Sequence, residues 1–540
     1  MFHLFGQKYR LWRLMVENQE NLEENTQNES PDNLGEKLAY NLASISERLG
    51  KSPDIIIREF NFGQKEAISA AIIYIDGLTD KSQIDRDILS PLLAEAKKTD
   101  SFLPENLLTL VQRKVIPVGE VKIKSNIDKI VDSILSGNTV LLIEGIDESL
   151  IISTQGWEKR AIEEPASEVV VRGPREGFTE TLRTNTSLIR RKIHNSNLTF
   201  EVMSIGKRTN TDVCIAYIKG IADDKLITEI KRRLKRINTD SILESGYIEE
   251  FIEDAPFSIF PTIARSERPD TVAGKLLEGR AAILVAGTPF VLTVPILFIE
   301  VFQSPEDYYS RAYYGSLVRW VRYIAFVLST LLPAIYVSLL SFHQELIPTP
   351  LLVTLAASRE GLPFPVVIEA LSMGLIFEIL REAGIRLPRP IGQAVSIVGA
   401  LVIGQAVVSA GLVGAPMVIV VALTAIASFV IPALADASAF LRVALTIMAG
   451  FLGAFGVIIG LLGLLIHLAS LRSFGAPYLS PVAPFFATDL KDVIVRAPWW
   501  AMLFRPYNFG WNDPERQEFQ LISKPSPKNK RDYSKKRGGK

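Results

Sequence analysis

The stretch VALTIMAGFLGAFGVIIGLLGLLIHLAS, residues 443–470, decides the fold class of this chain. It holds no Asp, Glu, Lys or Arg, and it exceeds the roughly 20 apolar residues that a helix needs to cross the hydrocarbon core of a membrane. The segment therefore predicts a transmembrane helix. The whole protein has 540 residues and is 48% hydrophobic, which is too apolar for a uniformly soluble protein of this length.

The charged residues divide the chain into two halves. No lysine occurs between Arg280 and Lys491, whereas lysine is common on both sides of that interval. A soluble half is therefore expected to precede a membrane half. The formal net charge of zero sums over both halves and says nothing about acidic or basic partners.

Six apolar segments are candidates for the membrane half, which we expect to occupy residues 276–480 with four to six helices. The first contains Pro289 and Pro295, so it is expected to be kinked or re-entrant if it does not span. The third carries carboxylates, and the other four are long and apolar enough to span. The segments are 281–303, 322–342, 361–380, 391–411, 415–434 and 443–470.

Both termini are expected on the cytoplasmic side. Residues 1–34 read as an arm and linker without the apolar core of an export signal. The arm fits either a short helix on the membrane surface or a frayed tail. Residues 481–540 form a strongly basic tail, expected to be disordered at its end. Two cytoplasmic termini require an even number of spans.

The soluble half reads as α/β, with two subdomains at residues 35–160 and 161–275. Short runs rich in β-branched residues predict buried strands at 67–76, 139–144 and 211–219. An amphipathic helix is predicted at 226–237, directly after the last of these strands. The basic face of that helix lacks an aromatic platform, which favours a solvated surface, and no nucleic acid partner is expected.

The soluble half carries no recognisable catalytic motif. A phosphate-binding loop, a nucleophile elbow and the zinc-protease motif are all missing from the sequence. Cys214 is the only cysteine, and the four histidines lack metal-ligand spacing. We expect no enzymatic activity, no cofactor and no metal site.

The third apolar segment, PVVIEALSMGLIFEILREAGIRLPRP at residues 365–390, raises the question of what carboxylates do in an otherwise apolar helix. At 100° per residue, Glu369 and Glu378 point in opposite directions, which argues against one shared ion site. Glu378 continues into Arg381 and Glu382, a polar stripe suited to the wall of an aqueous path. Glu369 is then expected to face a neighbouring helix. The alternative is an interfacial helix with solvated glutamates.

Two segments carry small residues at helical spacing, which predicts close helix contact. The contacting helix could belong to the same chain, to another copy or to a different subunit. The small residues considered are Gly392, Ser396, Ala400 and Gly404 in the fourth segment, and Ala449, Gly453, Gly456, Gly460 and Gly463 in the sixth.

Several long blocks resemble the A subunits of bacterial spore germinant receptors. One is PFSIFPTIARSERPDTVAGKLLEGRAAILVAGTPFVLTVPILFIEVFQSPEDYYSR, residues 256–311, and another is LPFPVVIEALSMGLIFEILREAGIRLPRPIGQAVSIVGALVIGQAVV, residues 362–408. VVRGPREGFTETLRTNTSLIRRKI, residues 170–193, and DLKDVIVRAP, residues 489–498, resemble the same family. The blocks occur in the family's order.

The resemblance implies two cytoplasmic α/β subdomains and a polytopic membrane domain in the spore inner membrane. It also implies a transporter-like B subunit that binds the nutrient, a lipoprotein C subunit, contact with membrane lipid, and oligomerisation into a nutrient-gated ion channel. The termini would lie on the side of the spore core. Two alternatives remain: a related A-like protein that acts with the dipicolinate-release machinery, and a self-sufficient secondary transporter, which should contain two repeated halves.

Overall fold

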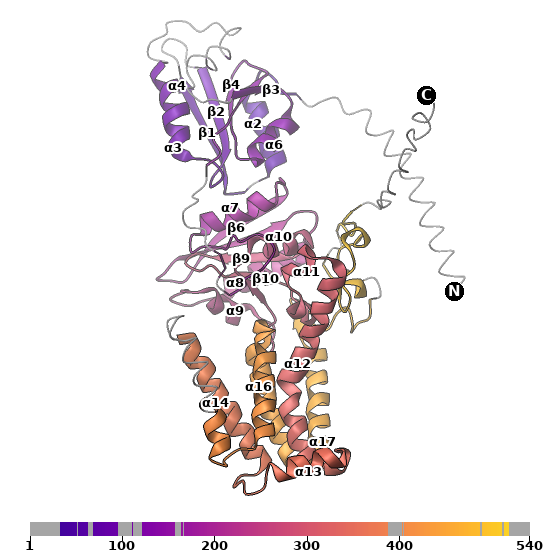
Figure 1. Ribbon diagram of the computed structural model, residues 1–540. Coiled ribbons are helices and arrows are strands. Elements are labelled where there is room, and N and C mark those ends of the chain that lie inside the picture. Colours follow the sequence, from indigo (N-terminus) through magenta and orange to yellow (C-terminus); the bar gives the residue numbers. More distant parts are fainter. Residues whose placement is uncertain are drawn as a thin grey trace, which may run out of the picture.

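The protein, seen here as a computed structural model, consists of two stacked α/β domains followed by a group of long helices (Figure 1). The structure describes residues 33–50, 52–62, 68–95, 108, 111, 121–156, 164–165, 167–386, 402, 404–486, 489–509 and 512–517. The expected N-terminal arm and the basic end of the tail lie outside these residues.

The first α/β domain contains an antiparallel five-stranded sheet of order β1-β2-β4-β5-β3. Helices cover both faces, so β4 is buried throughout. This explains why the strand reads as an uninterrupted apolar run. The strands are β1 (Ile55–Phe62), β2 (Ile68–Ile75), β3 (Val121–Lys124), β4 (Thr139–Ile143) and β5 (Ser149–Ile152); the helices are α2 (Leu38–Leu49), α3 (Lys81–Gln83), η1 (Ile84–Leu89), α4 (Ser90–Glu95) and α6 (Ile127–Leu135).

The second α/β domain repeats this arrangement, with the sheet order β6-β7-β9-β10-β8. The predicted helix at 226–237 is α8, capped by the Asp223 side chain, and it buries an apolar face on the sheet. The strands are β6 (Leu198–Ile205), β7 (Thr211–Ile218), β8 (Ala264–Ser266), β9 (Ala281–Val285) and β10 (Val291–Val294); the helices are α7 (Leu182–Lys192), α8 (Asp224–Arg236), α9 (Ser245–Ile252) and α10 (Pro269–Leu277).

A buried ion pair joins the two α/β domains. Arg190 on α7 places Nη2 2.8 Å from Asp54 Oδ2, and both side chains are almost inaccessible. Ser52, beside Asp54, accepts a hydrogen bond from the backbone N–H of Phe200 in β6. Removing one member of such a pair leaves an uncompensated buried charge, so the contact fixes how the domains meet.

The first of the six apolar segments, 281–303, is not a membrane segment. It forms β9, β10 and the short helix η3 (Phe298–Phe302) of the second domain. The expected domain boundary at residue 275 is therefore wrong, because it separates these strands from their own sheet. Strands buried on both faces are as apolar as a membrane helix, and Gly287, with φ of 92°, lies in the turn between them.

The helical part begins after α11 (Pro305–Tyr309). Two of its described helical stretches are long and apolar enough to cross a membrane, Ala312–Ser341 and Pro432–Ser470, and a shorter apolar helix covers Ala415–Phe429. The elements are α12 (Ala312–Ser341), η4 (Gln344–Leu346), α13 (Thr349–Ala357), α14 (Val366–Arg386), α16 (Ala415–Phe429), η5 (Pro432–Leu434) and α17 (Ala435–Ser470).

The long helix α17 is a hairpin of two helices that reverses at Gly453. This glycine has φ of 60° and ψ of −141°, outside the helical region. A Cβ atom on Gly460 would overlap the Leu445 side chain, although fifteen residues of straight helix would separate them by about 22 Å. Leu434 and Leu468, near the two ends of the stretch, lie in one apolar cluster beside the second α/β domain. The sixth apolar segment therefore supplies one complete limb and most of the other.

After α17 the chain returns to the second α/β domain. A small hairpin, β11 (Arg472–Ser473) and β12 (Ala476–Pro477), leads to the short helices η6 (Leu490–Asp492) and η7 (Trp499–Ala501). This C-terminal segment lies beside α11 and the start of α12 (Figure 1). Segments about 180 residues apart in the sequence thus meet where the soluble and helical parts join.

Candidate functional site

Glu378 lies in a charged cluster between α14 and α17. Its Oε2 is 2.8 Å from Arg381 Nη2, one turn along the same helix, and its Oε1 accepts a hydrogen bond from Arg442 Nη2 on α17. Side chains of Leu375 and Ile379 are exposed on the same helix. Glu378 and Arg381 were expected on one polar stripe, whereas the second partner, Arg442, could not be read from the sequence.

The Glu378 cluster retains unused hydrogen-bonding capacity. Arg442 Nη1 and Thr446 Oγ1, one turn apart on α17, are buried and have no hydrogen-bond partner among the described residues. The Glu378 side chain itself is 27% exposed, against 8% for Arg442. Polar groups are costly in an apolar layer, so this grouping is typical of a site that admits water or ions.

Glu369 belongs to a separate site. It is completely buried, with Oε1 2.9 Å from Arg359 Nη2 and Oε2 accepting from the Gly414 backbone N–H at 3.3 Å. Nine residues of helix place it about 14 Å along the axis from Glu378. The two glutamates therefore share no ion site, and Glu369 faces the loop that leads into α16.

Glu382 is not drawn into the Glu378 cluster. It is 56% exposed and pairs with Arg386 on the next turn, at 2.6 Å. An exposed pair of this kind contributes little to stability and occurs on any solvated helix. Of the predicted polar stripe, Glu378 and Arg381 remain together, and Glu382 is a matched control for them.

The predicted glycine contacts lie within this chain where they are described. Gly456 and Gly460 of the second α17 limb pack on Met448 and Leu445 of the first, whereas Gly463 has open space at its Cβ position. Gly404 lies 3.7 Å from Val418 Cγ1, measured from the position of a Cβ. The other residues of that seam, Gly392, Ser396 and Ala400, lie outside the described residues.

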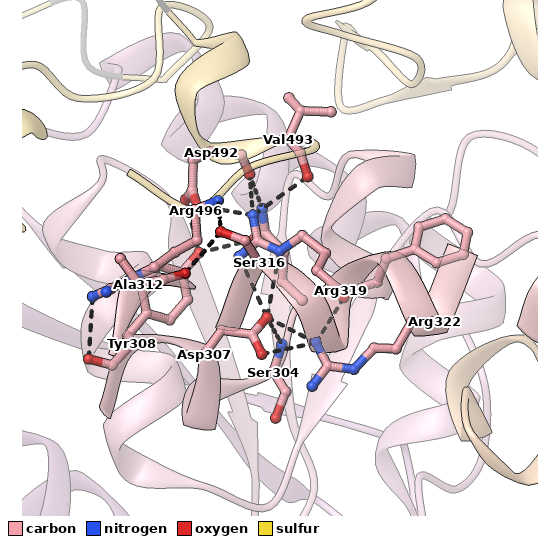
Figure 2. Close-up of polar contacts among 12 residues, drawn as sticks. Ser304, Asp307, Tyr308, Ala312, Ser316, Arg319, Arg322, Asp492, Val493 and Arg496 are labelled. Carbon is pink, nitrogen blue, oxygen red and sulfur yellow. Dashed lines mark hydrogen bonds and ion pairs between the residues drawn. The ribbon is translucent and has the colours of Figure 1, made fainter. Parts of the chain in front are cut away.

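A second polar cluster, which sequence reasoning missed, occupies the junction between the soluble and helical parts (Figure 2). Asp307 of α11 binds Arg322 Nη1 at 2.7 Å and Arg319 Nη2 at 3.3 Å, both on α12. The Asp307 carboxylate also accepts from the backbone N–H of Ser304, closing the first turn of α11. Gly315 of α12 allows α12 to approach Asp307 this closely, because a Cβ there would lie 2.9 Å from the Asp307 carbonyl oxygen.

The C-terminal segment completes this junction cluster. Arg319 Nη1 donates to the Asp492 carbonyl oxygen at 2.6 Å and lies 3.0 Å from its Oδ1. The Tyr308 hydroxyl donates to Asp492 Oδ2 at 2.8 Å. Burial, reinforced by the Asp492 carboxylate, raises the pKa of Tyr308 well above its usual value, so this hydroxyl keeps its proton. Arg496 adds a bond from its backbone N–H to the Ser316 hydroxyl.

The central charges of the junction cluster are buried. Arg319 is fully buried and Asp307 is 2% exposed, so each depends on the other for compensation. Breaking a buried pair of this kind typically costs about 3–5 kcal/mol. The sequence offered one signal, the Ser-Pro-Glu-Asp start of α11, but nothing in it indicated that residues 489–498 would lie beside that helix.

The described residues contain no group of three or more His, Cys, Asp or Glu side chains that could hold a metal ion. The expected lack of metal and cofactor remains a prediction.

Comparison with known proteins identifies the family. A family model described as Bacillus/Clostridium GerA spore germination protein matches residues 43–508. This chain belongs to that family. The predicted resemblance to spore germinant receptor A subunits is thereby confirmed, although the match assigns no role to any single residue.

Individual relatives are similar over most of their length. Spore germination protein KA of Bacillus subtilis (strain 168) is 50% identical over 491 residues, which cover 91% of this chain and 90% of that protein. The uncharacterized membrane protein YfkQ of the same organism is 46% identical, over 90% of this chain and 93% of its own. One solved structure is also similar: the crystal structure of the N-terminal domain of the A subunit of the Bacillus megaterium spore germinant receptor GerK3. Its chain is 40% identical in sequence, and the match covers 50% of this chain and 99% of the GerK3 chain, with a TM-score of 0.40.

Proposed function

We propose that this GerA family protein is the membrane subunit of a spore germinant receptor and converts nutrient sensing by a partner subunit into ion release. It acts as an oligomeric, nutrient-gated ion channel in the spore inner membrane, together with a transporter-like B subunit and a lipoprotein C subunit. Membership of the GerA family and the similarity to spore germination protein KA support the receptor role.

The observation that carries the channel proposal is the Glu378 cluster. A carboxylate costs on the order of 3 kcal/mol at the centre of a bilayer unless water or a partner charge compensates it. Glu378 is compensated by Arg381 and Arg442, yet it stays partly exposed and lies beside buried donors that have no partner in the described part of the chain. A polar wall of this kind can pass an ion between apolar helices.

Six membrane crossings fit this proposal. They are α12, α14, the segment 391–411, α16 and the two limbs of α17; most of 391–411 lies outside the described residues. The reversal at Gly453 supplies the sixth crossing in place of the 281–303 segment. An even number keeps both termini on the side of the α/β domains, which is the side that the basic tail favours.

The junction cluster couples movements of the soluble domains to movements of the helices. Arg319 and Arg322 belong to α12, whereas Asp307 and Asp492 belong to the segments that hold α12 against the second α/β domain. A shift of that domain must move these buried charges together, because separating them is costly. Coupling through this cluster requires no catalytic residue.

The proposal is tested in spores that carry Glu378→Gln or, as the control, Glu382→Gln. Both substitutions remove one carboxylate from α14, but only the first alters the Glu378 cluster. We expect Glu378→Gln to change the rate or the nutrient threshold of cation release at normal protein abundance, and Glu382→Gln to leave both unchanged. Normal release from both variants at normal abundance would exclude Glu378 from the ion path.

A further inference from the structure

Four large apolar side chains are exposed on and beside α9 of the second α/β domain. Tyr247 and Phe251 lie one turn apart on the outer side of the helix, with exposed fractions of 45% and 56%. Leu243, 62% exposed, precedes the helix, and Phe257, 100% exposed, follows it. These four residues are called the α9 apolar face.

Helix α9 is therefore apolar on two sides. Its inner side buries Ile248 and Ile252 in the core of the second domain. Surface helices of soluble proteins normally place polar residues opposite such a core, and a helix that is apolar on both sides is normally covered on both. Bulky apolar residues grouped on a surface mark a contact site more reliably than single ones.

The position of the α9 apolar face indicates what covers it. Ser258, the residue after Phe257, places Oγ 2.9 Å from Nε2 of His467, in the last turn of the apolar helix α17. Phe260 packs with Leu468 in the same apolar cluster. Figure 1 shows α9 at the end of the second domain that faces the long helices. The face thus lies where α17 emerges from the apolar part of the protein.

We infer that the α9 apolar face inserts into the headgroup layer of the membrane and holds the second α/β domain against the lipid surface. The inference rests on the proposed placement of α17 across the membrane. Tyr side chains are enriched at the membrane–water interface, and helices that lie on a membrane bury Phe and Leu side chains at the headgroup boundary. Glu250 on α9 and Asp254, two residues after the helix, are also exposed, so the insertion is apolar and does not need anionic lipid.

The test uses the full chain in phosphatidylcholine nanodiscs, with Cys214 replaced by Ala and a spin label on one introduced cysteine. Phe257→Cys reports on the α9 apolar face. Leu462→Cys, 54% exposed on the second limb of α17, is the membrane control. Val202→Cys, 48% exposed on β6, is the solvent control. Collision with oxygen, which partitions into lipid, is compared with collision with a water-soluble nickel chelate.

We expect the label at 257 to show an oxygen-to-nickel ratio several-fold above that at 202 and below that at 462. A ratio at 257 equal to that at 202 would show that the face lies in water. Protection of 257 from both reagents would show that protein, such as a second copy, covers it; either result overturns the inference while a high ratio at 462 leaves the membrane placement intact. A low ratio at 462 would reject both the inference and the proposed topology.

Discussion

Arg319 on α12 lies with its Nη1 atom 3.0 Å from Oδ1 of Asp492, although 173 residues separate the two in the sequence. The contact brings the C-terminal segment to the first long helix, where Asp307 binds the same guanidinium. The entry to the helical part and the return from it are thus held together by one buried arginine.

Asp307→Asn should be more damaging than Asp492→Asn. Asp307 is 2% exposed and compensates two arginines, whereas Asp492 is 29% exposed and binds only Arg319 among them. We expect the free energy of unfolding to fall by about 3 kcal/mol in Asp307→Asn and by about 1 kcal/mol in Asp492→Asn. Thermal unfolding of the purified chains measures both. Equal losses would mean that the cluster does not depend on the burial of Asp307.

Gly460→Leu should prevent the α17 hairpin from closing, since a side chain at this position overlaps Leu445 of the first limb. Gly463→Leu is the matched control, because its Cβ position is open. We expect Gly460→Leu to lower the amount of folded protein in the membrane and Gly463→Leu to leave it unchanged. Folded protein is measured by detergent extraction and size-exclusion chromatography. If both variants are folded but neither assembles, the glycines contact another subunit and not the hairpin's own limb.

Glu249 gives the second α/β domain a dependence on pH. Burial raises its pKa from 4.5 to about 7, and neighbouring Glu253 adds to the effect while Arg265 opposes it. The folded state therefore binds this proton more tightly than the unfolded state, and stability is lost as the pH rises from about 4.5 to 7. Glu249→Gln should stabilise the protein by on the order of 1 kcal/mol at pH 8 and have little effect at pH 4. Thermal unfolding at the two pH values measures the difference, and the same gain at both would rule out the titration of Glu249.

Residue patterns predicted the α/β and helical halves but not every border between them. Segment 281–303 was predicted as a membrane segment because strands covered on both faces have no polar side to reveal them. Their pairing with β7 and β8 depends on residues up to 72 positions earlier, which local periodicity does not record.

The candidate site could be predicted only where its partners lie on one helix. Arg381 is one turn from Glu378, so the helical period placed both on one polar stripe, and the structure pairs them. Arg442 is 64 residues away, and it reaches Glu378 only because α14 and α17 pack together. The reversal at Gly453 was equally hidden, since glycines at helical spacing predict helix contact and a single glycine with positive φ looks no different in the sequence.

The most direct test of the channel proposal is the ion selectivity of the reconstituted receptor complex with Glu378 or with Glu378→Gln. A carboxylate on the wall of an ion path favours cations, whereas a purely structural one affects only the amount of active protein. We predict a nutrient-dependent conductance whose reversal potential in a salt gradient shifts toward the anion value in the variant. An unchanged reversal potential, or no nutrient-dependent conductance in the unsubstituted complex, would contradict the proposal.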